Sequence, residues 1–438
     1  MFRRMQELRV GVIGLNGRGM DHVGAFASLP GVTVAALCDP DEATWGRALT
    51  ELDKRGKPKP ATYRDLRRLL DDKTVDAVSI ATPNHWHALA AYWAMAAGKH
   101  VYVEKPVSHN FLEGRTLILA QRKFGKICQG GTQCRSNPGM IEAMEYLHSG
   151  TLGKVKIARG LCYKLRLSIG KGAGRPPASA DYDLWLGPAP NKPLSRQRFH
   201  YDWHWFWDYG NGDLGNQGVH QVDIARWGLK KNNHPRRVSS IGGRLGYEDD
   251  GETPNTQIVW CDYGDSELIF EVRGLPTDDY QGAKIGVVFH CEGGTMVVPS
   301  YDEAKAFDPA GKEIRAFKGG ANHYKNFVDA IRENKPSLLT SPIEEGHYSS
   351  AICHAGNISY RLGVKGGLEL DRFNGSKREG MERMSEHLSK ALSGKPYEIR
   401  YGRELVIDAR NENFGRDREA NDLLFREYRA PYILPRRP

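Results

Sequence analysis

The sequence predicts an α/β protein in which a doubly wound parallel sheet is followed by a second part built on antiparallel strands. Three observations predict it. In residues 8–130, apolar runs alternate with helical patterns, and a glycine-rich turn follows the first run. Beyond about residue 150, short alternating runs are separated by turn residues. At 438 residues the chain is too long for one compact core, so we expect two domains.

The first part has the repeated order strand, helix, strand. Its predicted strands are 8–13, 32–38, 75–81 and 100–103, with a short run at 61–66, a brief helix to Leu70, and a helix at 87–97 closed by Gly98. In such sheets ligands bind beyond the carboxyl ends of the strands. We therefore expect the functional site where these strands end.

The turn after the first strand is the most informative feature, and it reads Gly14-Leu15-Asn16-Gly17-Arg18-Gly19. Glycines let the backbone approach a pyrophosphate, and the helix N-terminus that follows supplies free N–H groups. Asp39, at the end of the second strand, stands where an acidic residue accepts hydrogen bonds from the adenosine ribose. Asn16 replaces the second glycine of the usual pattern, and asparagine tolerates a positive φ better than other non-glycine residues. A tight turn without a ligand is the alternative.

Asp39 also predicts which nicotinamide cofactor is bound. Its carboxylate would repel a 2′-phosphate, and the residues that follow, Pro40-Asp41-Glu42, place no arginine beside it. We therefore expect NAD, with NADP the less favoured cofactor.

The sequence pattern changes from about Cys128, where the second part begins. Its alternating runs at 256–260, 267–272 and 285–289 predict an antiparallel sheet, and helical patterns occupy 140–148, 323–332, 343–362 and 377–392. The tail beyond is extended and rich in arginine. We expect a cofactor domain at 1–130, a substrate domain at 131–370, and an extension at 371–438 that packs on both.

Composition limits the classes of partner. The net charge of +9 comes from dispersed basic residues, so we expect no nucleic-acid partner. The longest apolar stretch, 88–98, is too short to span a bilayer, so we expect no membrane partner. Seven widely spaced cysteines without a C-x-x-C pair predict reduced thiols and a cytoplasmic location. Arg3-Arg4 lacks the apolar region of an export signal; had a twin-arginine leader been removed, the location would be periplasmic.

Two residues are candidates for acid–base chemistry. Lys105, in Glu104-Lys105-Pro106 at a strand end, could polarise a hydroxyl or carry its proton; a surface lysine before a turn is the alternative. His220 opens a helical pattern after small residues, and a neutral imidazole is a natural general base, although a lone histidine is more often structural. Asp223 shares a helix face with it, which suits an orienting role.

The segment 199–209 interleaves Trp, Tyr and Phe with Asp and His. Aromatic faces suit the apolar side of a sugar, and Asp202, His204 and Asp208 suit its hydroxyls. A buried aromatic core or an oligomer contact is the alternative. His200 and His204 have i,i+4 spacing, and His85, His87 and His220 could complete a metal site. No companion His-Glu pattern supports zinc, so we expect no metal.

Taken together, these residues resemble the Gfo/Idh/MocA family, the glucose–fructose oxidoreductase and inositol dehydrogenase group. The resemblance covers roughly residues 8–365. It rests on the glycine turn, Thr82-Pro83-Asn84-His85-Trp86-His87, Glu104-Lys105-Pro106, Tyr182-Asp183-Leu184-Trp185-Leu186-Gly187-Pro188 and Gly218-Val219-His220-Gln221-Val222-Asp223. It implies a Rossmann domain, then an α/β domain with a large, open, mainly antiparallel sheet through which copies assemble, and NAD(P)-dependent oxidoreduction of sugars or polyols.

By the same resemblance, Lys105 matches the family's active-site lysine and His220 its acid/base histidine. Many members carry Asp four residues before that histidine, where this chain has Asn216, which suits a substrate hydroxyl rather than a proton relay. The expected cofactor-binding residues are Gly14, Asn16, Gly17, Arg18, Gly19, Asp39, Thr82, Pro83, Asn84, His87, Glu104 and Lys105. The expected substrate-binding residues are Trp185, Tyr201, Trp203, His204, Asn216 and His220.

The sequence therefore predicts an NAD-dependent oxidoreductase acting on a secondary hydroxyl of a sugar, sugar derivative, polyol or glycoside. One alternative is a redox-neutral enzyme that retains NAD and cleaves a glycoside by oxidation, elimination and re-reduction. The other is a cofactor-sensing binding protein without turnover, against which the presence of both Lys105 and His220 argues. We expect a homo-oligomer, a dimer or tetramer, formed through the open sheet.

Overall fold

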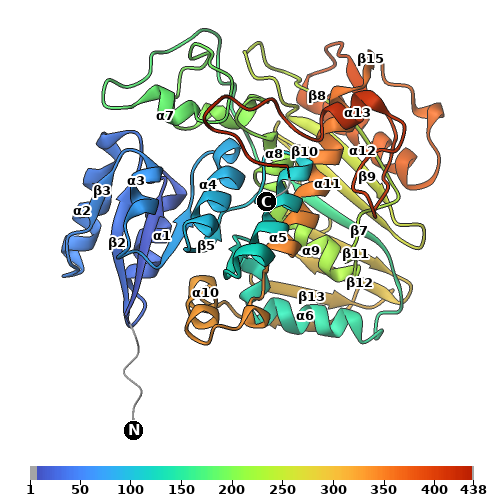
Figure 1. The fold of residues 1–438 in the computed structure, drawn as a ribbon. Helices are drawn as coiled ribbons and strands as arrows, with labels where there is room; N and C mark the ends of the chain where they lie inside the picture. Colours follow the sequence, from blue (N-terminus) through green and yellow to red (C-terminus); the bar gives the residue numbers. More distant parts are fainter. Residues whose placement is uncertain (1–6, 437–438) are drawn as a thin grey trace.

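The computed structural model describes residues 7–436. Its N-terminal part holds a six-stranded parallel sheet in the order β3-β2-β1-β4-β5-β6, which confirms the doubly wound prediction (Figure 1). The strands are β1 Leu8–Ile13, β2 Val32–Cys38, β3 Ala61–Tyr63, β4 Ala77–Ile80, β5 His100–Val103 and β6 Cys128–Gly130. The strand order reverses between β1 and β4, and ligands bind at such a reversal.

Helices cover both faces of this sheet. One face packs against α1 (Arg18–Ala27), α2 (Trp45–Lys54) and α10 (His323–Arg332). The other packs against α3 (Leu66–Asp71), α4 (Asn84–Ala96) and α5 (Phe111–Phe124). Because both faces are covered, the strands are apolar at nearly every position, and Val10 and Val12 of β1 are fully buried. α10 reaches this domain from far along the chain.

The second part contains an 11-stranded sheet in the order β14-β13-β12-β11-β7-β10-β9-β8-β16-β15, with β17 paired to β8. β7 and β10 run parallel, and the other described pairs are antiparallel, which confirms the large, mainly antiparallel sheet. The strands are β7 Val155–Cys162, β8 Arg237–Gly243, β9 Thr256–Asp262, β10 Glu267–Arg273, β11 Ile285–Cys291, β12 Gly294–Val298, β13 Glu303–Phe307, β14 Glu313–Lys318, β15 Val364–Gly366, β16 Ile399–Tyr401 and β17 Leu405–Val406.

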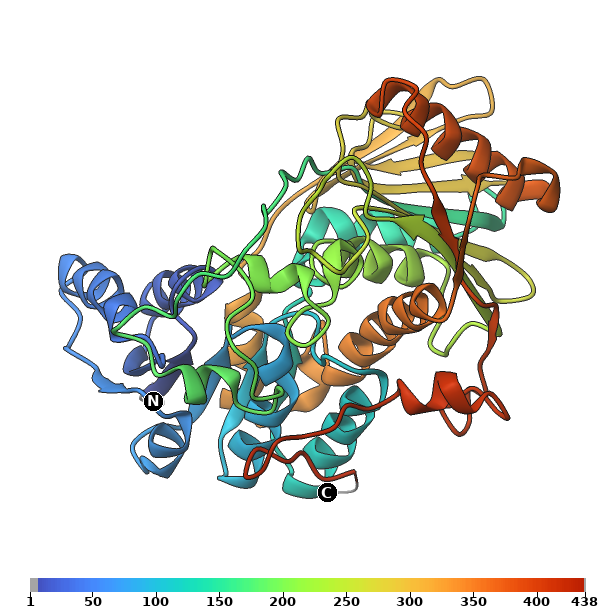
Figure 2. The ribbon, with the colours of Figure 1, turned by 90° about the horizontal axis from the view of Figure 1, so that it is seen from above.

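The two faces of the large sheet are covered differently. One face packs on α6 (Pro138–His148), α9 (Gly218–Gly228) and α11 (Ile343–Arg361), which form the main core with it. α12 (Gly375–Ala391) lies on the opposite face, where its Met381, Met384 and Leu388 join Trp260 and Ile269 of the sheet (Figure 2). The remaining helices are the short α7 (Tyr182–Leu186), α8 (Gly212–Gly215) and α13 (Arg418–Asp422).

The predicted helices and strands agree with the structure to within a few residues. The described tail after α12 is largely extended, as predicted, but it also pairs with the large sheet as β16 and β17 and forms the short α13. These strands have two or three residues and no periodic pattern, because pairing with β8 creates them. All seven cysteines are unpaired. No helix within residues 7–436 is long and apolar enough to cross a membrane.

Candidate active site

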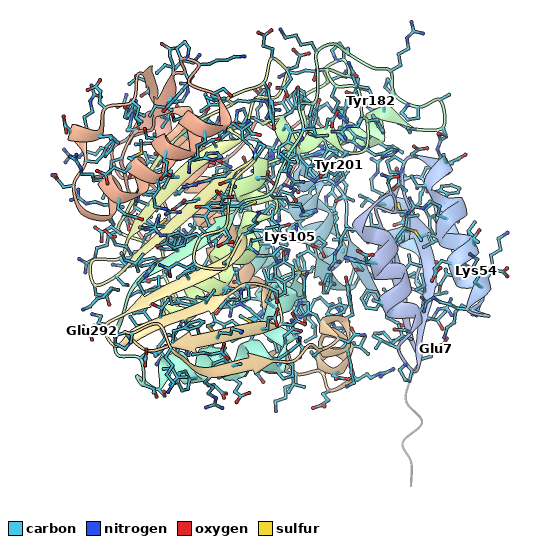
Figure 3. All side chains as sticks on the ribbon, turned by 180° about the vertical axis from the view of Figure 1, so that it is seen from behind. Glu7, Lys54, Lys105, Tyr182, Tyr201 and Glu292 are labelled. Carbon is cyan, nitrogen blue, oxygen red and sulfur yellow. The ribbon has the colours of Figure 1, made fainter. Side chains whose placement is uncertain are left out.

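A cavity of about 280 Å³ lies between the carboxyl ends of the parallel strands and residues 179–210, which we call the lid segment. The Rossmann side contributes the glycine turn and the ends of β2, β4 and β5, as expected for a doubly wound sheet. The lid segment contributes Leu184, Trp185, His200, Tyr201, Trp203 and His204. Lys105 lies near the junction of the two domains (Figure 3).

The glycine turn is shaped for close approach. Gly14 has φ +87°, and a Cβ there would stand 2.7 Å from the Ala81 backbone. A Cβ on Gly19 would stand 1.7 Å from the Gly14 carbonyl oxygen, so this glycine lets helix α1 pack on the turn. A Cβ on Gly17 would meet nothing within 4 Å, which leaves open space at the N-terminus of α1. The positive φ falls on Gly14 and not on Asn16, so our argument from asparagine's tolerance of that conformation is wrong.

Asp39 ties the turn to the end of β2. Its carboxylate accepts hydrogen bonds from the backbone N–H of Leu15 at 2.8 Å and of Asp41 at 2.9 Å. Burial raises the pKa of Asp39, and these two bonds oppose the rise. Each carboxylate oxygen keeps a lone pair for a ribose hydroxyl.

These residues fit a nicotinamide dinucleotide. The free N–H groups of α1 and the open space at Gly17 suit a pyrophosphate, and Asp39 suits the adenosine ribose. Thr82, on the cavity wall, has a buried Oγ1 with no hydrogen-bond partner among the described residues, so a ligand group could satisfy it.

Glu104 lines the cavity and bonds two side chains of α1. Its Oε1 accepts from Arg18 Nε at 2.9 Å and lies 3.1 Å from His22 Nε2, while His22 Nδ1 lies 2.7 Å from Ser79 Oγ. Burial opposes ionisation of this carboxyl, but Arg18 and His22 hold its pKa well below the usual range. Glu104 therefore stays ionised next to Lys105.

Lys105 is held by Asn216. Its Nζ donates to the Asn216 carbonyl at 3.0 Å, and the Asn216 Oδ1 lies 3.4 Å away. Burial lowers the pKa of Lys105, as do the charges of Arg18 and Lys164, while Glu104 opposes the shift. Asn216 thus has a contact that the sequence did not predict: it orients the lysine.

His220 lies in the first turn of α9 and is buried. Its ring stands 4.9 Å from that of Tyr301, and no described group bonds its Nδ1. Burial and the charge of Lys105 lower the pKa of His220 to about 3, so the imidazole is neutral at neutral pH and can accept a proton. Asp223 does not orient it: its carboxylate bonds Arg135 at 2.7 and 3.0 Å and Ser349 at 2.7 Å.

The aromatic residues of the lid segment serve both as cavity lining and as a buried core, the two interpretations that the sequence left open. Trp185, Tyr201, Trp203 and His204 line the cavity, and Trp185 and Trp203 also belong, with Trp205, Phe206 and Tyr209, to a small buried core. Two polar predictions are wrong. Asp202 accepts from Arg198 Nε at 2.8 Å, and Asp208 accepts from Lys192 Nζ at 2.7 Å, so each carboxylate already has a cationic partner and neither lines the cavity.

Most of the predicted site residues meet in this one cavity. Those that line it are Gly14, Asn16, Gly17, Arg18, Asp39, Thr82, Pro83, Asn84, His87, Glu104, Lys105, Trp185, Tyr201, Trp203, His204 and Asn216. Gly19 and His220 do not line it: Gly19 packs under the turn, and His220 lies within range of the Lys105 charge. The sequence analysis missed Arg64 and Trp86 on the wall: Arg64 belongs to no motif, and Trp86 lies within the 82–87 motif but was given no role.

The histidines that we weighed as metal ligands are separated. His85 contacts the Trp185 carbonyl, His87 the Thr82 and Pro106 carbonyls, and His200 the Asp41 carboxylate. A different set does converge: one ligand-type atom from each of His234, His347 and Glu412 lies within 4.8 Å of the others. That cluster lies outside the cavity lining.

Comparison with known proteins agrees with this geometry. Residues 8–132 match the NAD-binding Rossmann-fold domain of the Gfo/Idh/MocA oxidoreductases, and residues 154–391 match their C-terminal α/β domain. The fold and site therefore define an NAD-binding oxidoreductase. The chain belongs to the Gfo/Idh/MocA family.

Curated relatives match over part of the chain. An α-N-acetylgalactosaminidase of Shewanella oneidensis is 40% identical over 129 residues, which are 28% of this chain and 28% of that relative. A glycosyl hydrolase family 109 protein of Shewanella sp. ANA-3 is 40% identical over 156 residues, 35% of this chain and 34% of the relative. The matched segment thus spans only about a third of either protein.

Solved structures share the fold. Levoglucosan dehydrogenase in complex with NADH and levoglucosan aligns with a TM-score of 0.60 at 21% identity, covering 80% of this chain and 96% of that one. The WlbA dehydrogenase of Bordetella pertussis, in complex with NADH and UDP-GlcNAcA, aligns with a TM-score of 0.60 at 19% identity, covering 82% and 98%.

Proposed function

We propose that this protein uses NAD to oxidise a secondary hydroxyl of a sugar, sugar derivative, polyol or glycoside. The observation that carries the proposal is Lys105 on the cavity wall, held by Asn216, which lies four residues before the buried His220 of α9. An ammonium donor and a neutral base can serve the oxygen and the proton of one alcohol.

The proposed reaction divides its work between these side chains. Lys105 donates a hydrogen bond to the substrate oxygen and stabilises negative charge developing there. His220 takes the hydroxyl proton: burial and the Lys105 charge lower the pKa of its imidazole and keep it neutral, so a ring nitrogen has a free lone pair. When bound, NAD supplies the hydride acceptor, so the alcohol loses a proton and a hydride and becomes a ketone. Positioning of donor and acceptor in the cleft lowers the entropic barrier.

Carbohydrate is the substrate class that we favour. Tyr201 and Trp203 present aromatic faces to the cavity beside His204, and Arg166 donates to Tyr201 Oη at 2.9 Å while pairing with Asp213 at 2.6 Å. A surface of aromatic faces edged by fixed polar groups suits a sugar ring. In this proposal residues 1–130 bind the cofactor, residues 131–370 bind the substrate, and residues 371–438 pack on both.

A second candidate is glycoside cleavage with NAD retained through a cycle of oxidation, elimination and re-reduction. Two observations favour it. Curated relatives are named as an α-N-acetylgalactosaminidase and as glycosyl hydrolases. The lid segment also bonds the Rossmann domain beside the ribose site, where His200 Nε2 lies 2.8 Å from Asp41 Oδ2, and a covered cofactor suits retention.

One assay separates the candidates. Purified protein with NAD is offered free sugars, polyols and nitrophenyl glycosides, including the α-N-acetylgalactosaminide, while NADH absorbance and released nitrophenol are followed together. Accumulating NADH supports the dehydrogenase, and nitrophenol release without NADH supports the retained-NAD cycle. Binding of NAD with neither product from any substrate would contradict both and support the non-catalytic alternative.

We also propose that copies assemble through the large sheet. α12 covers the outer face over β8–β10, and a second small core buries Val288 of β11 and Val297 of β12, so the free part lies over β13 and β14, where Ile314 is exposed. Light scattering coupled to size-exclusion chromatography should give a dimer or tetramer that Ile314→Lys weakens. A monomer at all concentrations would contradict this proposal.

A further inference from the structure

The end of the chain crosses from the large sheet to the lid segment. Residues 423–436, which we call the strap, follow α13 and run along α5 (Figure 1). Arg429 Nε donates to the Gly187 carbonyl at 3.0 Å, and its Nη2 donates to the Asp183 carbonyl at 2.9 Å. Its Nη1 pairs with the Asp183 carboxylate. Arg426 Nη2 donates to the Asp208 carbonyl at 2.9 Å. The strap therefore forms hydrogen bonds with residues near both ends of the lid segment.

The same strap is fixed to the Rossmann domain. Tyr432 and Leu434 are buried in the core that α3, α4 and α5 form with the parallel sheet. The Tyr432 ring meets Trp86 edge to face at 5.5 Å, and Tyr428 Oη donates to Glu113 at 2.7 Å. A lid that moved away from the cofactor would have to break its bonds to the strap or pull Tyr432 out of this core.

The lid segment also bonds the loop that follows β2. Asp41 accepts from His200, Glu42 N–H donates to the Ser179 carbonyl at 3.3 Å, and Asp181 N–H donates to the Pro40 carbonyl at 2.9 Å. These bonds lie directly after Asp39. The lid segment is thus held both by the loop after β2 and by the strap.

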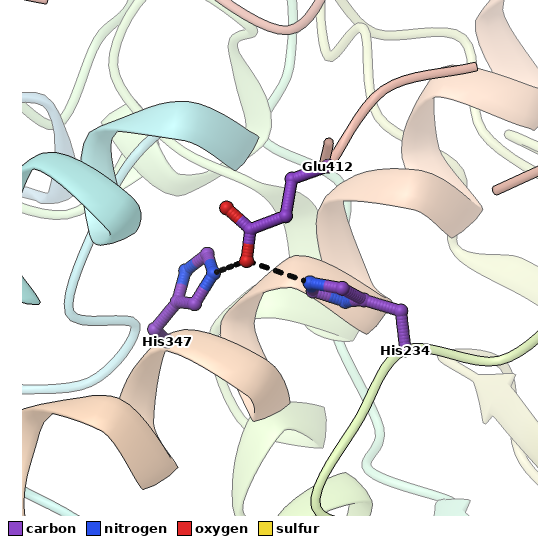
Figure 4. Close-up of side chains that lie close together, drawn as sticks. All are labelled: His234, His347 and Glu412. Atoms are coloured by element: carbon purple, nitrogen blue, oxygen red, sulfur yellow. Dashed lines mark hydrogen bonds and ion pairs between the residues drawn. The ribbon is translucent and has the colours of Figure 1, made fainter. Parts of the chain in front are cut away.

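The C-terminal segment is also fixed before the strap begins, by a buried cluster of His234, His347 and Glu412. His347 Nε2 and His234 Nε2 each lie 3.0 Å from Glu412 Oε1 (Figure 4). Although burial raises it, the pKa of Glu412 is held below its usual range by the two imidazoles. A metal ion on both Nε2 atoms would leave both Nδ1–H groups as buried donors, since neither Nδ1 has a partner among the described residues. We therefore interpret the cluster as a set of structural hydrogen bonds that fixes the C-terminal segment, and not as a metal site.

We propose that the strap holds the lid segment closed over the cofactor and sets the rate at which NAD leaves, with Arg429 as the positioning residue. Arg429 touches neither the cavity nor the reacting atoms, so it acts through the lid. The inference rests on the proposed function only in that NAD occupies this cleft; it requires no particular sugar.

The test measures NAD release from the full-length protein. NAD-loaded protein is mixed with excess alcohol dehydrogenase and ethanol, which convert each released NAD to fluorescent NADH. Arg429→Ala should speed release about tenfold or more, because three bonds from a charged donor are lost at once. Arg429→Lys should restore release partly, since an ammonium can keep one of them.

Two further variants keep the inference falsifiable. Arg403→Ala is the matched control: Arg403 pairs with Asp417 and Glu419 of the same C-terminal segment and makes no side-chain bond to the lid, so release should not change. Asp183→Asn removes the negative charge on the lid side of this contact, at an exposed carboxylate. It should speed NAD release even if Arg429→Ala does not fold. If folded Asp183→Asn and any folded Arg429→Ala released NAD at the wild-type rate, the proposal that the strap controls NAD release would be wrong. The assay contains no sugar, so a wrong substrate assignment leaves its result unchanged.

Discussion

Asp39→Asn tests the cofactor site most directly. The substitution keeps the shape of the side chain and removes the charge. In the wild type the carboxylate accepts from Leu15 N–H and Asp41 N–H and still has lone pairs for the ribose hydroxyls. An amide offers one accepting oxygen, so one backbone N–H or one hydroxyl must lose its partner.

The magnitude follows from these contacts. A hydrogen bond to a charged group contributes about 1.5–3 kcal/mol, so loss of one such bond to the ribose should raise the Kd for NAD roughly 10- to 100-fold. NADP should be affected less, because removal of the charge also removes the repulsion of its 2′-phosphate. The ratio of the two Kd values should therefore narrow about tenfold or more.

Calorimetric titration of both cofactors into apo-protein measures this ratio, and thermal unfolding checks that the variant is folded. Asp53→Asn, on the exposed side of α2, changes the net charge equally and should leave both affinities unchanged. If folded Asp39→Asn bound NAD within about threefold of wild type, the role that we assign to this carboxylate would be refuted. Tighter binding of NADP than NAD by the wild type would refute the cofactor preference.

Lys105→Ala and His220→Ala should each lower turnover about 100-fold with NAD affinity largely kept, and near-wild-type kinetics of either variant would remove it from the mechanism. Both tryptophans belong to the small buried core, so Trp203→Ala and Trp205→Ala should each lower the melting temperature, but only Trp203→Ala should raise KM because only its ring lines the cavity; an unchanged KM in folded Trp203→Ala would contradict the carbohydrate cleft. Burial lowers the pKa of His220 and of His354 to about 3, below the value near 6.5 of an unfolded chain. The unfolded state therefore binds more protons as pH falls through about 6.5, and the melting temperature should drop between pH 7 and 5; an unchanged value would show that these imidazoles are not buried neutral.

The local elements were predictable because their signals are local. The glycine turn, the strand ends at Asp39 and Lys105, and the helix at His220 each follow from fewer than about fifteen neighbouring residues. Tertiary pairing was not predictable. Asp41 and His200 lie 159 positions apart, and Arg166 and Asp213 lie 47 apart, so neither pair leaves a spacing that one sequence can reveal. Asp208 and Asp223 misled us for the same reason, because Lys192 and Arg135 pair with them from 16 and 88 positions away. Asp202 is different: Arg198 lies only four residues before it, and that local pair was overlooked.

The core of the Rossmann domain is completed by residues that a ribosome makes last. Tyr324, Phe327 and Val328 of α10 fill one side of its sheet, and Tyr432 and Leu434 fill the other. During synthesis, residues 8–132 therefore emerge without their full apolar partners and must wait for some 300 further residues before their core can close. Residues 8–132, which match the family's Rossmann domain, therefore do not contain all of the side chains that form that domain's core. A chain that ended before Tyr432 would lack part of the core on the α3–α5 side of the sheet.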